Sequence, residues 1–169
     1  MLLSYDFYGD IRLFKYICQK TETMVISRTL IKPLHPPLEM SSQILQQGTN
    51  HKHLGLFFSN NGLWYDHIDY IVKKAYTRLN MLRKVRFILN RFTLEKMYFS
   101  FIRPILQYGD VVWDMQTRYF INKIEYVQSE AARIVTGGTK LTSIQKLYDE
   151  TGWEKLLERR EKHKLILHY

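Results

Sequence analysis

The hydrophobic pattern of the chain changes near residue 64, and this change limits the folds open to it. The first 58 residues are strand-like, whereas from Trp64 onward apolar residues recur at the 3.6-residue spacing of an α-helix. The first apolar stripe consists of Trp64, Ile68, Ile71, Val72, Ala75, Leu79 and Leu82. These residues predict one amphipathic helix of about five turns. We expect it to end or bend near Val85, because Arg86 would fall on its apolar side.

Further helices are predicted after this one. A second helix should begin with Thr93 as its N-cap, be apolar nearly all round and therefore buried, and kink at Pro104. A third has an apolar stripe from Phe120 to Val135 and stops at Gly137-Gly138. The last two are a short helix near residues 143–149 and a charged helix from Glu154.

Strand candidates occupy the first third of the chain, at residues 21–28, 38–46 and 54–58. Three prolines within residues 33–37 force an extended connection, and Asn60-Asn61-Gly62 is a strong turn signal. The predicted fold class is therefore α+β, with a small antiparallel sheet followed by a helical bundle.

The positive charge of the chain is unevenly distributed. With 25 Lys and Arg against 16 Asp and Glu, the net charge of +9 favours polyanionic partners, either nucleic acid or an acidic membrane surface. Between Asp69 and Glu95 there are seven cations and no carboxylate. These cations are Lys73, Lys74, Arg78, Arg83, Lys84, Arg86 and Arg91.

The predicted first helix separates its cations from its apolar stripe. At 100° per residue, Lys73 and Lys84 lie opposite that stripe, with two more cations on one flank and Arg83 on the other. Such a helix can pack on a core and present a cationic face to phosphates. The alternative is a solvated face without a partner. The nearby aromatic residues can stack on bases or belong to the core: Tyr70, Tyr76, Phe87 and Phe92.

The sequence indicates no cofactor and no catalytic constellation. A single cysteine, Cys18, excludes an intrachain disulfide and a cysteine-based zinc site. A histidine-based metal set is conceivable, but its spacing matches no strong signature. Its members would be His51, His53 and His67 with Asp66 or Asp69.

No segment of the sequence is apolar enough to cross a membrane, because the longest candidate, residues 97–113, contains Arg103, Pro104 and Asp110. The first residues lack the pattern of a signal peptide. We therefore expect an intracellular protein, cytoplasmic or nuclear, that is not secreted.

Several short segments resemble, in order, the reverse transcriptases (RNA-directed DNA polymerases) of jockey-like non-LTR retrotransposons. The resemblance covers about residues 20–169, and the ordered combination is more specific than any one segment. The segments are Lys20-Thr21-Glu22-Thr23-Met24-Val25-Ile26-Ser27, His51-Lys52-His53-Leu54-Gly55-Leu56, Trp64-Tyr65-Asp66-His67-Ile68, Ile102-Arg103-Pro104-Ile105-Leu106, Ala131-Ala132-Arg133-Ile134-Val135-Thr136-Gly137 and Glu150-Thr151-Gly152-Trp153.

This resemblance implies a division of the chain. Residues 20–62 would be the edge of the palm, residues 63–138 a thumb-like helical bundle that grips the template–primer duplex, and residues 139–169 a truncated helical C-terminal extension. Residues 1–19 form a leader that does not match the family. The turn at His53, Leu54 and Gly55 is similar to the primer grip, a hairpin that steadies the primer 3′ end.

The same resemblance implies what is missing. Family members bind two divalent metals through aspartates of the palm, and this sequence does not show them. We therefore expect a truncated, inactive reverse transcriptase with residual, non-sequence-specific binding to RNA, DNA or a hybrid. Mg²⁺ is expected only in a full-length member, of which this segment could be the tail. Exposed sheet edges predict self-association. The alternative is a small basic helical module that binds an acidic protein or lipid surface.

Overall fold

The computed structural model describes residues 20–29, 34–114 and 117–167. The predicted leader, residues 1–19, lies outside them. The chain divides into two compact units, Met1–Asp66 and His67–Tyr169, which we describe separately. The α+β class is confirmed, because short strands occupy the first unit and helices the second. No described helix is long and apolar enough to cross a membrane.

The first unit contains three separate ladders of two strands among its described residues. The strands are β1 (Glu22–Thr23), β2 (Glu39–Met40), β3 (Gln43–Ile44), β4 (Gln46–Gln47), β5 (Asn50–His53) and β6 (Leu56–Ser59). β2 pairs with β3 and β5 with β6 in antiparallel register, whereas β1 pairs with β4 in parallel. The prediction of one antiparallel sheet is therefore wrong.

The reason lies in the shortage of buried apolar surface in this unit. Leu56 is its one buried apolar side chain among the residues described, while Leu34, Leu38 and Ile44 are exposed. A sheet of three or more strands is stabilised by burying an apolar face, and the described part of this unit has no such face to bury. Each ladder therefore stops at two strands, whether it joins neighbours, as the two-residue turn between β2 and β3 does, or distant segments, as β1 and β4 do.

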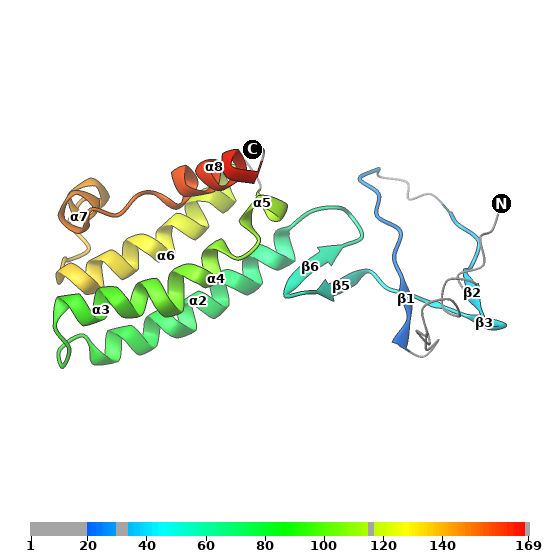
Figure 1. The fold of residues 1–169 in the computed structure, drawn as a ribbon, viewed down its shortest axis with the longest axis horizontal. Helices are drawn as coiled ribbons and strands as arrows, with labels where there is room; N and C mark the ends of the chain where they lie inside the picture. Colours follow the sequence, from blue (N-terminus) through cyan, green and yellow to red (C-terminus); the bar gives the residue numbers. More distant parts are fainter. Residues whose placement is uncertain (1–19, 30–33, 115–116, 168–169) are drawn as a thin grey trace. The chain divides into compact units, whose positions relative to one another are not determined.

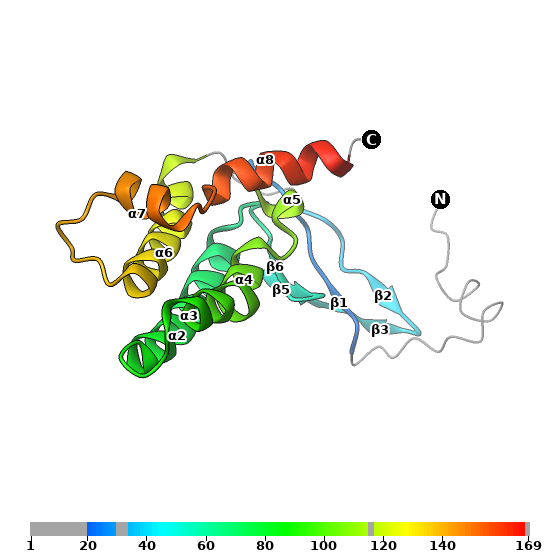
Figure 2. The ribbon, with the colours of Figure 1, turned by 60° about the vertical axis from the view of Figure 1, so that its left-hand side comes forward.

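The second unit is built on three long helical segments. Its elements are α2 (Tyr65–Val85), α3 (Arg91–Met97), the π-helical turn η2 (Tyr98–Ile102), α4 (Arg103–Gln107), α5 (Asp110–Trp113), α6 (Arg118–Thr136), α7 (Ile144–Thr151) and α8 (Leu156–Leu167). In Figure 1, α2 and α6 run in the same direction, and α3, η2 and α4 run back in the opposite direction. Figure 2, a view turned by 60° from that of Figure 1, shows α7 beside α6 and α8 beside α5.

The first predicted helix is confirmed as α2. It ends at Val85, and six of the seven predicted stripe residues, from Ile68 to Leu82, are buried. Trp64 lies just before the helix and is half-buried. The burial of this stripe fixes which side of α2 faces solvent.

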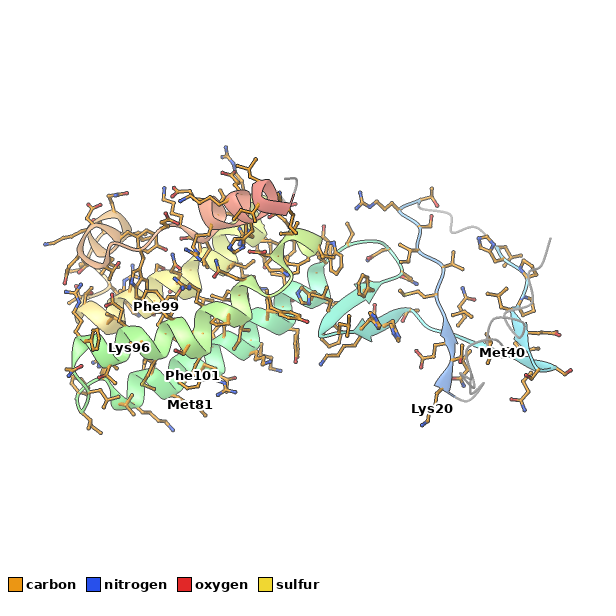
Figure 3. All side chains as sticks on the ribbon, in the orientation of Figure 1. Lys20, Met40, Met81, Lys96, Phe99 and Phe101 are labelled. Carbon is orange, nitrogen blue, oxygen red and sulfur yellow. The ribbon has the colours of Figure 1, made fainter. Side chains whose placement is uncertain are left out.

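The second predicted helix differs from its prediction at three points. Asn90 is the N-cap in place of Thr93, and its side-chain oxygen accepts from the Thr93 N–H at 2.9 Å. The expected kink at Pro104 takes the form of η2, where the Arg103 N–H bonds to the Tyr98 carbonyl five residues back. Its burial is one-sided, since Phe101, labelled in Figure 3, is 55% exposed.

A buried polar network attaches α7 and α8 to α6. The Glu125 carboxylate accepts from the Tyr148 hydroxyl at 2.6 Å and from the Leu156 N–H at 3.0 Å. Gln128 accepts from the Tyr98 hydroxyl at 2.5 Å and donates to the Glu154 carbonyl at 2.8 Å. All of these partners lie within the protein, so the network stabilises the fold rather than forming a reactive site.

Candidate nucleic-acid interface

All seven predicted cations lie on the surface of the helical unit. Because the opposite side of α2 is buried, its cations point away from the core. The seven side chains differ in their contacts with carboxylates and aromatic rings of the protein, and we describe them in two groups.

Two of the seven cations are paired with carboxylates of the protein, and a third, beyond the end of α2, lies over an aromatic ring. Arg83 donates to Glu130 of α6 at 2.6 Å, and Glu130 also accepts from Arg133 at 2.6 Å. Arg91 donates to the Glu150 carboxylate at 2.9 Å and to the carbonyl of the same residue at 2.7 Å. The Arg86 guanidinium lies 4.3 Å from the centre of the Phe87 ring. Arg83 and Arg91 therefore have structural roles that the linear charge pattern did not reveal.

The other four cations are Lys73, Lys74, Arg78 and Lys84, which we call the cationic face. All are exposed, and the structure gives none of them a carboxylate partner among the described residues. Lys74 lies 5.9 Å from the Tyr70 ring. Lys73 and Lys84 are eleven positions apart and only about 20° apart around the helix, so they are about 16 Å apart along it. This face offers uncompensated positive charge along one side of α2.

The turn predicted to resemble the primer grip is a tight hairpin in the first unit. Leu54 and Gly55 join β5 to β6, with His53 paired to Leu56. Both turn residues have positive φ, 46° and 84°, as a type I′ turn requires. Leu54 is 75% exposed at the apex. The hairpin is thus present, and its contact with a primer stays a prediction.

The metal set considered from the sequence draws its residues from both units: His51 and His53 lie in the first and His67 in the second. His51 and His53 share one face of β5, with ring centres 6.3 Å apart, and His51 lies 3.6 Å from Glu22. In the other unit His67 is buried against the Trp113 ring at 5.5 Å. No three potential metal ligands cluster among the residues that the structure describes.

Buried ionisable groups of the helical unit have perturbed pKa values. Burial lowers the pKa of His67 to about 4, so this side chain is neutral near pH 7. Burial also raises the pKa of Glu125 and, even more strongly, those of Tyr98 and Tyr148. None of these groups belongs to the cationic face.

Sequence reasoning missed one exposed cation of α3. Lys96, labelled on α3 in Figure 3, lies with its ammonium 4.2 Å from the centre of the Phe92 ring. Glu95 interrupts the run of cations just before it, but the Glu95 carboxylate is engaged by the Trp153 indole N–H at 3.0 Å. A count along the chain could not reveal that this carboxylate is turned toward the protein.

Comparison with curated proteins finds a similarity between part of this chain and an RNA-directed DNA polymerase of a transposon. The similar protein is the probable RNA-directed DNA polymerase from transposon BS of Drosophila melanogaster, with 27% identity over 124 residues. The match covers 70% of this chain and 13% of that protein, so the chain spans a small part of its relative. No protein-family model and no solved structure matches the chain.

Proposed function

We propose that this chain is the part of a transposon reverse transcriptase that holds the template–primer, corresponding to the thumb and its flanking segments. The cationic face of α2 contacts the phosphate backbone of an RNA–DNA hybrid without reading its sequence. The observation that supports this most directly is a group of four exposed cations on α2, without carboxylate partners among the described residues, in a chain similar to an RNA-directed DNA polymerase. Phosphate contacts position a protein on a duplex but carry no sequence information.

The proposal assigns binding of the template–primer, and not catalysis, to these residues. The chain corresponds to the C-terminal region of a jockey-like enzyme, and the aspartates that bind two divalent metals belong to another part of the palm. The hairpin at Leu54-Gly55 steadies the primer. With Mg²⁺ and nucleotides added, this chain alone should not extend a primed RNA template.

Salt dependence of binding tests the contact with phosphates. If four cations touch phosphates, the logarithm of affinity falls with a slope of about −3.6 against the logarithm of salt concentration. Affinity for an RNA–DNA hybrid should then drop roughly a hundredfold between 50 and 200 mM salt. Binding that is absent at low salt, or indifferent to salt, contradicts the proposal.

Charge reversal locates the interface. Changing Lys73, Lys74, Arg78 and Lys84 to Glu should abolish hybrid binding while circular dichroism shows the helices intact. The matched control reverses four exposed cations elsewhere on the helical unit, namely Arg118, Lys140, Lys146 and Lys155. Both variants fall from a net charge of +9 to +1, since each reversal removes two charges. Equal loss of binding in both would show that net charge, not this face, governs the interaction.

A further inference from the structure

The turn between α2 and α3 exposes three large apolar side chains. Phe87, Ile88 and Phe92 are 84%, 80% and 63% exposed, although they lie within six positions of one another. We call them the apolar tip. Single exposed apolar residues are ordinary, but a group of them at one end of an element marks a surface that binds something. Figure 1 shows this turn at one end of the helical unit, where α2 gives way to α3.

The two phenylalanine rings of the tip are each paired with a cation. The Arg86 guanidinium lies 4.3 Å from the centre of the Phe87 ring, and the Lys96 ammonium lies 4.2 Å from that of Phe92. Both rings remain more than half exposed. In each pair the cation lies over one face of an apolar ring, so a base would stack on the opposite face. A ring with a positive charge next to it suits a nucleotide, which has a flat base and a phosphate.

The tip is held in place by the protein. The Ile88 N–H bonds to the Val85 carbonyl at 3.0 Å, and Asn90 caps α3. Arg91, directly before Phe92, is bonded twice to Glu150 of α7. Rings presented on a fixed turn lose less conformational freedom on binding than rings on a loose loop.

The tip follows the cationic face in the sequence. No carboxylate occurs between Asp69 and Glu95, so the sequence from the first cation to the tip carries no negative side chain. Lys73 and Val85, the last residue of α2, are twelve positions apart, about 18 Å at helical rise, and the tip follows two residues later. Cations spread over this length can follow a polyanionic strand.

We propose that Phe87 and Phe92 stack on unpaired bases, so that the apolar tip binds the single-stranded nucleic acid that extends from a duplex held on the cationic face. This inference rests on the proposed function, because it assumes that the cationic face holds the duplex from which the unpaired strand extends. Base–aromatic stacking tolerates any sequence, in keeping with contacts to the phosphate backbone.

A paired binding measurement tests the tip. One ligand is a blunt RNA–DNA hybrid, and the other is the same hybrid with a single-stranded extension carrying 2-aminopurine at its first unpaired position. The wild-type chain should bind the extended hybrid about five- to tenfold more tightly, and stacking should change the 2-aminopurine fluorescence. Phe87→Ala with Phe92→Ala should remove this preference and the fluorescence change, while binding to the blunt hybrid stays as in the wild type.

Tyr119→Ala is the matched control. Tyr119 is 63% exposed, the same as Phe92, and also lies near a lysine, with the Lys123 ammonium 5.6 Å from its ring centre. This variant should keep the preference for the extended hybrid. If it loses the preference as fully as the tip variant does, the inference is overturned.

The outcomes separate this inference from the proposed function. Intact binding to the blunt hybrid without a preference for the extension overturns the inference alone. Failure to bind either hybrid overturns both. Binding to the extended hybrid only, lost in the tip variant, supports the tip and contradicts duplex binding by the cationic face. Tip-dependent binding to phosphatidylserine vesicles, with nucleic-acid preference unchanged in the tip variant, would replace the inference with a membrane contact.

Discussion

At the scale of single residues, burial determines which charged groups can act at the surface. His67 is 1% exposed and packs against Trp113, so its imidazole is kept neutral, while Lys73 and Lys74, about two turns further on, remain in water. Partners matter as much as exposure. Arg83 is exposed, yet its charge is already matched by Glu130 at 2.6 Å.

His67 should make the fold sensitive to acid. Its pKa is about 4 in the folded protein and 6.5 in an unfolded chain, so between these values the unfolded state binds more protons. Stability is therefore lost as pH falls from 6.5 toward 4, by about 2–3 kcal/mol from this side chain near pH 4.5. Urea unfolding near pH 7 and near pH 4.5 should show a smaller acid loss for His67→Gln than for the wild type. Equal losses would contradict this role.

At the scale of helices, Glu125 is the residue on which α7 and the start of α8 depend. Its two carboxylate oxygens accept from the Tyr148 hydroxyl and the Leu156 N–H. Glu125→Ala leaves both donors without this acceptor and should destabilise the helical unit by about 2–3 kcal/mol. Glu125→Gln should cost less, because an amide can accept from the N–H and donate to the hydroxyl oxygen.

Urea unfolding followed by tryptophan fluorescence measures this difference, since Trp153 stacks on Tyr98 next to the network, with ring centres 4.2 Å apart. Glu161→Ala, on the exposed side of α8, is the control and should leave the unfolding midpoint unchanged. If Glu125→Ala is as stable as this control, the network does not hold α7 and α8.

The elements also show how far local sequence determines structure. α2 was predictable because one apolar stripe over five turns has a single helical interpretation. The end of α6 was predictable because its C-cap, Gly137, has a φ of 73°, which favours glycine. The start of α3 was misplaced because Asn90 and Thr93 are both good caps. The strands were harder, since two-residue ladders such as β1–β4 depend on contacts 24 positions away.

At the scale of the whole chain, the candidate interface was predicted only in part. The run of seven cations located it, since charge along one helix can be read from spacing alone. The structural roles of Arg83 and Arg91 depend on Glu130 and Glu150, which are distant in sequence. The pairing of Lys96 with Phe92 on α3 likewise needed the folded structure to be recognised.

The central claim is that nucleic acid lies along the cationic face of α2. Lysine acylation read by mass spectrometry, with and without an RNA–DNA hybrid, measures this contact residue by residue. We predict that the hybrid protects Lys73, Lys74 and Lys84, while Lys140 and Lys146, also exposed, keep their reactivity. Uniform protection of all five, or protection of Lys140 and Lys146 alone, would contradict the account.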